Sequence, residues 1–84
     1  MAIEDLIQHH DKAIRVIMSC ETRDQLEVAE RFCVNLLRLH VKRASLLTAP
    51  TEKILYGEKI SESEEKLLNC LSHRKKFLKR LKRR

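Results

Sequence analysis

Apolar residues near the N-terminus recur at spacings of three and four along the chain. The positions of this pattern, which include one histidine, are Ile3, Leu6, Ile7, His10, Ile14, Ile17 and Met18. Such spacing is typical of one face of an amphipathic α-helix and predicts a first helix over residues 3–19. Thr22 and Gln25 then form a capping box, whose side chains satisfy free N–H groups at the start of the next helix. We therefore expect a short turn and an antiparallel helical hairpin.

A second apolar pattern extends from residue 23 to residue 47 and is wider than the first. It consists of Leu26, Ala29, Phe32, Cys33, Leu36, Leu37, Leu39, Val41, Ala44 and Leu47. At about 100° per residue the polar side chains form one narrow strip. That strip comprises Glu27, Arg31, Asn35, Arg38, Lys42 and Ser45. An apolar arc this wide needs neighbours on two sides, so we expect the second helix to be central to the fold or to an oligomer. The candidate interface residues are Phe32, Leu36, Leu39 and Leu47.

Residues 48–61 contain Pro50 and Gly57, and we expect them to connect the second helix to a third. A single helical turn can form within this connection over residues 51–56, with Gly57 as its stop. Ser61 and Glu64 then make a second capping box.

The segment after this capping box predicts a basic third helix over residues 62–84. The predicted fold is therefore all-α. It is either a three-helix bundle or a helical hairpin followed by a C-terminal basic helix, with a possible helical turn in the connection.

Composition limits the size of the core. Of the 84 residues, 36% are charged, compared with roughly 25% in typical soluble domains. We expect a single small domain, which buries only about 60–65% of the surface that its unfolded chain exposes.

Cysteine usage and the N-terminal residues predict a cytoplasmic or otherwise intracellular protein that is not secreted. Cys20, Cys33 and Cys70 are odd in number and widely spaced, unlike a paired disulfide framework. The sequence has no 18-residue apolar run that could span a bilayer. Glu4 and Asp5 lie where a signal peptide would be positive and then apolar.

Positive charge is concentrated at the C-terminal end. Residues 1–72 carry a net charge of −2, whereas residues 73–84 contain eight basic side chains and no acidic one. The basic residues are Arg74, Lys75, Lys76, Lys79, Arg80, Lys82, Arg83 and Arg84. Like charges this close repel one another on a helix, so a polyanionic partner should stabilise the segment.

A smaller basic strip, Arg31, Arg38 and Lys42, lies on the exposed side of the predicted second helix. Cations on two helices can hold a phosphate backbone without reading base sequence, because they displace condensed counterions. The sequence therefore predicts a protein that binds DNA or RNA through backbone phosphates. If about five to eight cations met phosphates, log K would fall against log salt with a slope of roughly −5 to −7 on duplex DNA.

Three other interpretations remain open. In the first, the basic residues serve only to solvate helix faces. Phe77, Leu78 and Leu81 line one side of the basic helix, which also fits a membrane-surface helix or a helix in a partner's groove. Arg74 interrupts this side and indicates that core packing stops near Leu71. Alternatively, the apolar arc of the second helix makes the chain an interaction or assembly module that self-associates or docks on a larger complex.

His10 and His40 lie within the apolar patterns of the first and second helices. We expect both imidazoles to be satisfied inside a small core or at a helix interface. A zinc site could be imagined from Cys33, His40, Cys70 and His73, but these residues lack the spacing of a tight ligand pair. No metal or cofactor is therefore predicted.

Catalysis is not expected. His9, His10 and Asp11 are adjacent, and neighbouring side chains on a helix point about 100° apart, so they cannot converge on one substrate atom. The sequence contains no glycine-rich phosphate loop, nucleophile elbow or HExxH motif.

Overall fold

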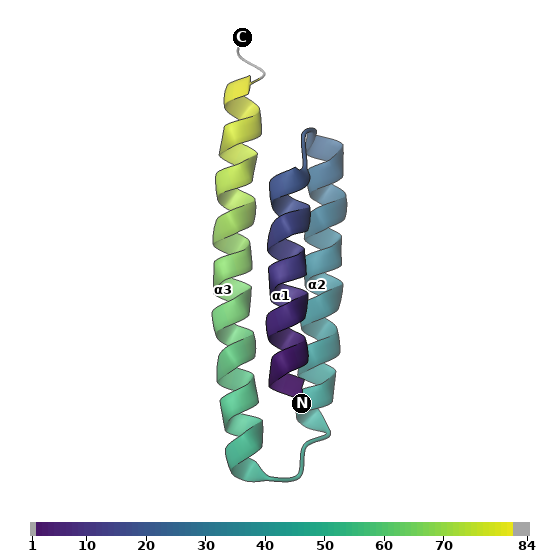
Figure 1. The fold of residues 1–84 in the computed structure, drawn as a ribbon, viewed down its shortest axis with the longest axis vertical. Helices are drawn as coiled ribbons and strands as arrows, with labels where there is room; N and C mark the ends of the chain where they lie inside the picture. The colour runs from purple at the N-terminus through teal and green to yellow at the C-terminus, as the bar shows by residue number, and fades with distance from the viewer. Residues whose placement is uncertain (1, 82–84) are drawn as a thin grey trace.

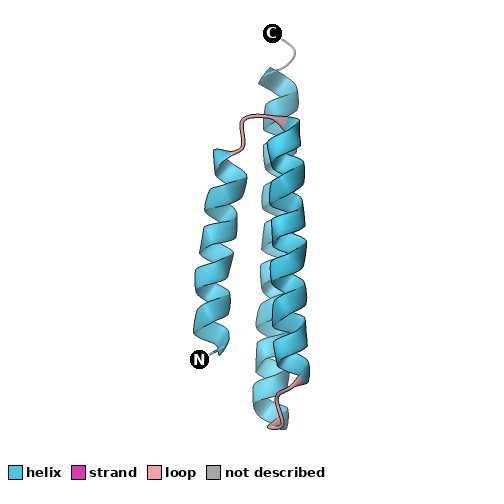
Figure 2. Ribbon diagram, turned by 90° about the vertical axis from the view of Figure 1, so that its right-hand side faces the viewer, coloured by secondary structure: helices cyan, strands magenta, loops and turns pink. Residues whose placement is uncertain are grey.

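The computed structural model describes residues 2–81, which form a bundle of three α-helices (Figure 1). The helices are α1 (Ala2–Ser19), α2 (Arg23–Ser45) and α3 (Pro50–Leu81). The chain ascends in α1, descends in α2 and ascends again in α3, and its two loops lie at opposite ends of the bundle (Figure 2). The all-α prediction is confirmed in its three-helix form.

The turn between α1 and α2 has the predicted cap. Thr22 has extended backbone angles, and its hydroxyl accepts a hydrogen bond of 3.1 Å from the backbone N–H of Gln25. The side-chain oxygen of Gln25 accepts a bond of 2.8 Å from the N–H of Glu21. The reciprocal bond thus reaches one residue further back than in the standard capping box. Two free N–H groups are satisfied locally, which explains why this boundary could be read from the sequence.

The predicted connection over residues 48–61 is wrong, because α3 begins at Pro50 and runs without a break through Gly57. Proline suits the first helical position, where its missing N–H is not needed. Gly57 has no positive φ and does not stop the helix. Tyr56 and Ile60 beside it are buried, so packing against the other helices offsets the cost of about 1 kcal/mol that glycine imposes in a helix.

The core extends along the bundle in two clusters. The larger contains Ala13, Ile17, Cys20, Leu26, Ala29, Cys33, Leu36, Leu67, Leu71 and Leu78. The smaller contains Leu6, Ala44, Tyr56 and Ile60 and lies near the loop between α2 and α3. The bundle measures 54 × 16 × 16 Å, and its radius of gyration of 14.6 Å exceeds the roughly 12 Å expected for a compact domain of this length. The elongated bundle therefore exposes more of its surface than a compact domain of the same length would.

Candidate nucleic-acid interface

The last turns of α3 present four exposed cations, Lys75, Lys76, Lys79 and Arg80. Residues four apart on a helix lie on the same side. Lys75 and Lys79 therefore form one pair, and Lys76 and Arg80 form a second pair on a neighbouring side of the helix. Lys82, Arg83 and Arg84, which were also predicted to bind nucleic acid, lie outside the described residues.

Arg74 is not part of this exposed group. Its guanidinium donates two hydrogen bonds to the backbone carbonyl of Cys20, from Nε at 2.9 Å and from Nη2 at 2.7 Å. The guanidinium also lies 4.5 Å from the centroid of the Phe77 ring. Cys20 follows the last residue of α1, where carbonyl groups lack intrahelical partners. Arg74 therefore fastens α3 to the turn between α1 and α2.

The position of Arg74 predicts that core packing stops near Leu71, and this prediction is wrong. Leu78 is only 8% exposed and belongs to the larger core cluster, one full turn beyond Arg74. Because the guanidinium satisfies a backbone carbonyl, a charged side chain can occupy the inner side of α3 without interrupting the packing.

A groove brings Lys75 and Lys79 together with Arg23, at the first turn of α2. Arg23 was not among the predicted binding residues. The available signal was topological: in an antiparallel pair, the start of the second helix lies beside the end of the third. The structure thus adds one cation to the basic end of the bundle and removes Arg74 from it.

The four exposed cations of α3 have no carboxylate partner among residues 2–81. The ion pairs there join Arg43 to Asp5 at 3.5 Å and Lys59 to Glu62 at 3.6 Å, both away from the basic turns. Cations at spacings of three and four repel one another when nothing neutralises them. The basic turns of α3 therefore favour a counterion or a polyanion at this end.

The second basic strip, Arg31, Arg38 and Lys42, is exposed along α2 as predicted. Two acids, Glu27 and Glu30, line the same shallow depression as Arg31 and Arg38. Lys42 lies 19 residues after Arg23 in sequence, about 28 Å along a helix. That separation is more than three Debye lengths at physiological salt, but Arg31 lies only eight residues after Arg23, about 12 Å along the helix. The strip is thus less positive than the end of α3, and only its far end is electrostatically separate from it.

The predicted interface residues of α2 have different environments. Leu36 is a core residue, whereas Phe32 and Leu47 are partly buried against the core. Leu39 is 43% exposed. The two neighbours that the wide apolar arc requires are α1 and α3 of the same chain, since each pair of helices is in contact. Only part of the arc remains available to another molecule.

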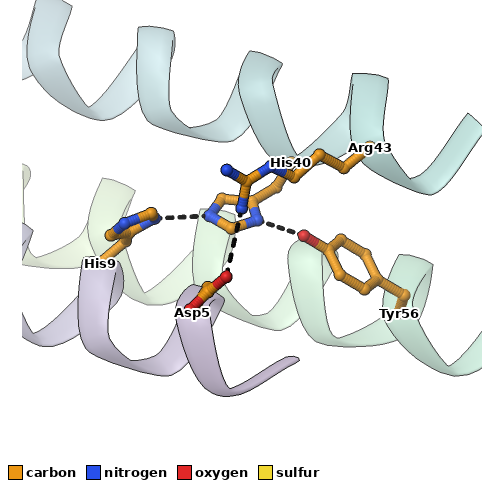
Figure 3. A network of polar contacts seen from close by, with 5 residues as sticks. All are labelled: Asp5, His9, His40, Arg43 and Tyr56. Atoms are coloured by element: carbon orange, nitrogen blue, oxygen red, sulfur yellow. Dashed lines mark hydrogen bonds and ion pairs between the residues drawn. The ribbon is translucent and has the colours of Figure 1, made fainter. Parts of the chain in front are cut away.

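The histidines form a polar network inside the bundle (Figure 3). His40 is fully buried, and its Nδ1 is hydrogen-bonded to the Tyr56 hydroxyl while its Nε2 lies 2.9 Å from Nδ1 of His9. The network joins all three helices, and the ion pair of Asp5 and Arg43 lies beside it. Burial, with smaller contributions from His9 and Arg43, lowers the pKa of His40.

His10 forms a similar contact, with its Nδ1 2.7 Å from the hydroxyl of Ser63. Burial is the largest cause that lowers its pKa. The prediction that His10 and His40 are satisfied internally is confirmed. Their partners Tyr56 and Ser63 could not be identified from the sequence, because both lie in the segment predicted as connection or as the first turn of the third helix.

The cysteines and histidines do not assemble a metal site. No group of three or more His, Cys, Asp or Glu side chains within residues 2–81 could hold a metal ion. Cys20, Cys33 and Cys70 are free thiols, and burial raises the pKa of each. A raised pKa keeps a thiol protonated and unreactive at neutral pH.

No helix in the part of the chain that the structure describes has an apolar stretch of the length needed to cross a bilayer.

Comparison with protein-family models, with curated proteins and with solved structures finds no match to this chain.

Proposed function

We propose that this protein binds nucleic acid through backbone phosphates, using the exposed cations at the end of α3. The observation that supports the proposal is the run of four cations, Lys75, Lys76, Lys79 and Arg80, without a carboxylate partner in residues 2–81. Lys82, Arg83 and Arg84 extend the same run in sequence. When these cations contact phosphates, they release counterions condensed on the nucleic acid, and this release favours binding.

The proposed binding is backbone-led. Phe77 is the aromatic residue nearest in sequence to the basic turns, and the Arg74 guanidinium lies over its ring. A single ring, 45% exposed, offers little of the aromatic surface by which base stacking often holds single strands. Phosphate contacts position a protein without specifying bases. We therefore expect similar affinity for duplexes of different sequence.

The salt dependence of binding tests this proposal. Four phosphate contacts predict a slope of log K against log salt of about −3.6 on duplex DNA, and seven contacts predict about −6. Fluorescence anisotropy with a labelled 20-base-pair duplex, between 50 and 300 mM salt, measures the slope. A duplex of unrelated sequence and an RNA duplex serve as comparison ligands.

Two double variants locate the contacts. We expect K76A/R80A to make the slope shallower by about 1.8, because two phosphate contacts are lost. The control is K12A/K53A, which removes two exposed cations from elsewhere on the bundle and leaves the same net charge. Equal effects of the two variants, or a slope near zero for the unmodified protein, would refute the proposal.

A protein-interaction or assembly role is the second candidate. It is supported by apolar side chains that α1 and α3 leave exposed on α2, including Val28 at 65% and Leu39 at 43%. A groove of about 390 Å³ beside Val28 is lined also by Val16 and Phe32. A dimer that persists in 1 M salt by light scattering, and that L39S dissociates, would favour this role over nucleic-acid binding.

We also propose that the protein occupies an intracellular, reducing compartment. Three free thiols support this assignment. Fractionation of cells that express the protein, followed by thiol labelling, tests it.

A further inference from the structure

One end of the bundle carries a groove in which apolar and cationic side chains meet. It has a volume of about 320 Å³ and lies between the start of α2 and the last turns of α3. Its lining residues are Glu21, Thr22, Arg23, Leu26, Lys75, Leu78, Lys79 and Leu81.

Three leucines form the apolar part of the groove. Leu26 and Leu78 are 5% and 8% exposed and contribute to the core, whereas Leu81 is 48% exposed. A phosphodiester backbone offers little apolar surface to such a floor. A ligand that fills the groove therefore needs apolar groups.

The charged part of the groove selects for negative charge. Arg23, Lys75 and Lys79 line it together with one carboxylate, that of Glu21. The lining side chains thus carry a net charge of +2. A ligand complementary to both parts is amphipathic and acidic.

We propose that this groove docks an acidic amphipathic segment of a partner protein. Its volume is near the lower limit of ligand pockets, which is roughly 300 Å³. It therefore suits a few projecting side chains better than a whole cofactor. A helix that offers apolar anchors one turn apart, flanked by Glu or Asp, would place its anchors on the leucines and its carboxylates beside the cations. A membrane surface is less well matched, because two of the three groove leucines, Leu26 and Leu78, are buried in the floor of the groove.

The proposal does not depend on nucleic-acid binding, but the two activities would share residues. Lys75 and Lys79 line the groove, whereas Lys76 and Arg80 do not. An occupied groove would therefore neutralise one pair of cations and leave the other exposed. Partner binding should weaken the attachment of nucleic acid without abolishing it.

The probe is a labelled 16-residue peptide of leucine and glutamate, with leucines at positions i, i+3, i+4 and i+7 of a helix. The control peptide has the same composition, with its leucines distributed around the helix. Binding is followed by fluorescence anisotropy with the full-length chain. Circular dichroism verifies that each variant remains folded.

We expect K75A/K79A and L81S each to weaken binding of the amphipathic peptide by roughly 10-fold. The matched variant K76A/R80A removes equal charge from the same turns and should change the affinity by less than about 3-fold, since rim charges outside the groove contribute little. The control peptide should bind at least about 10-fold more weakly, because it cannot bury its leucines together.

Several outcomes would overturn the proposal. Equal losses in the two double variants would mean that only net charge matters. Wild-type affinity in L81S, or equal binding of the control peptide, would mean that the apolar floor is not used. Vesicles of phosphatidylglycerol and phosphatidylcholine that bind in an L81S-sensitive manner, with no peptide binding, would assign the groove to lipid. By contrast, if the unmodified protein binds the peptide but no duplex, the nucleic-acid proposal is contradicted and the groove proposal stands.

Discussion

Replacing Arg74 by alanine tests whether this cation stabilises the bundle rather than binding a ligand. The change removes both hydrogen bonds to the carbonyl of Cys20 and the contact with the Phe77 ring. A hydrogen bond from a charged group contributes about 1.5–3 kcal/mol, and a cation–π contact at an exposed site about 0.5–1 kcal/mol. Both bonds share one acceptor, and solvent reaches the guanidinium. We therefore expect the free energy of unfolding to fall by the sum of the two lower limits, about 2 kcal/mol.

That loss is large for a protein of this size. Domains of 84 residues unfold with about 4–13 kcal/mol. A loss of about 2 kcal/mol should lower Tm by roughly 8–16 °C. Thermal and urea unfolding, followed by circular dichroism at 222 nm, measure the change.

Two further variants make the experiment specific. R74K keeps the charge but loses the planar fork, so it should fall between the unmodified protein and R74A. K76A removes a neighbouring exposed cation and should change stability by less than about 0.5 kcal/mol. If R74A is no less stable than K76A, the bonds to Cys20 do not stabilise the fold and Arg74 returns to the candidate ligand-binding residues.

Three more predictions concern the interior and α3. Because the folded state lowers the pKa of His10 and His40, the unfolded chain takes up protons first on acidification. Stability should be full above about pH 6.5 and fall as the pH drops below it; a urea midpoint that rises between pH 7.5 and 5.5 would contradict this. Y56F removes the hydroxyl partner of His40 and should cost about 1–3 kcal/mol in urea unfolding, because a buried imidazole nitrogen loses its bond. G57A should raise stability by about 1 kcal/mol, since a Cβ there meets no atom within 4 Å and glycine is a poor helix former; a lower Tm would show that residues 50–57 are not helical.

The features that could be predicted correctly from the sequence are those that short-range interactions determine. Thr22 and Gln25 are three residues apart, and their cap was found where it was expected. The polar strip that includes Arg31 and Lys42 is exposed, because helical periodicity alone separates polar from apolar sides.

Long-range contacts account for what was missed. Gly57 resembles a helix stop in isolation, and only the burial of Tyr56 and Ile60 against other helices shows why α3 continues through it. Arg74 and Cys20 are 54 positions apart, so no local pattern reveals that this cation is a structural residue. Arg23 joins the basic end for a similar reason, since packing of α2 against α3 places it there.

The length of α3 gives the molecule a marked electric polarity. Residues 1–72 carry a net charge of −2, and positive charge is concentrated in residues 73–84. The exposed cations Lys75, Lys76, Lys79 and Arg80 lie near one end of a rod 54 Å long, so that end would lead as the molecule approached a polyanion. Attached in that orientation, each molecule would contact the polyanion through its narrow end, so that many copies could stand side by side with their opposite ends facing solvent.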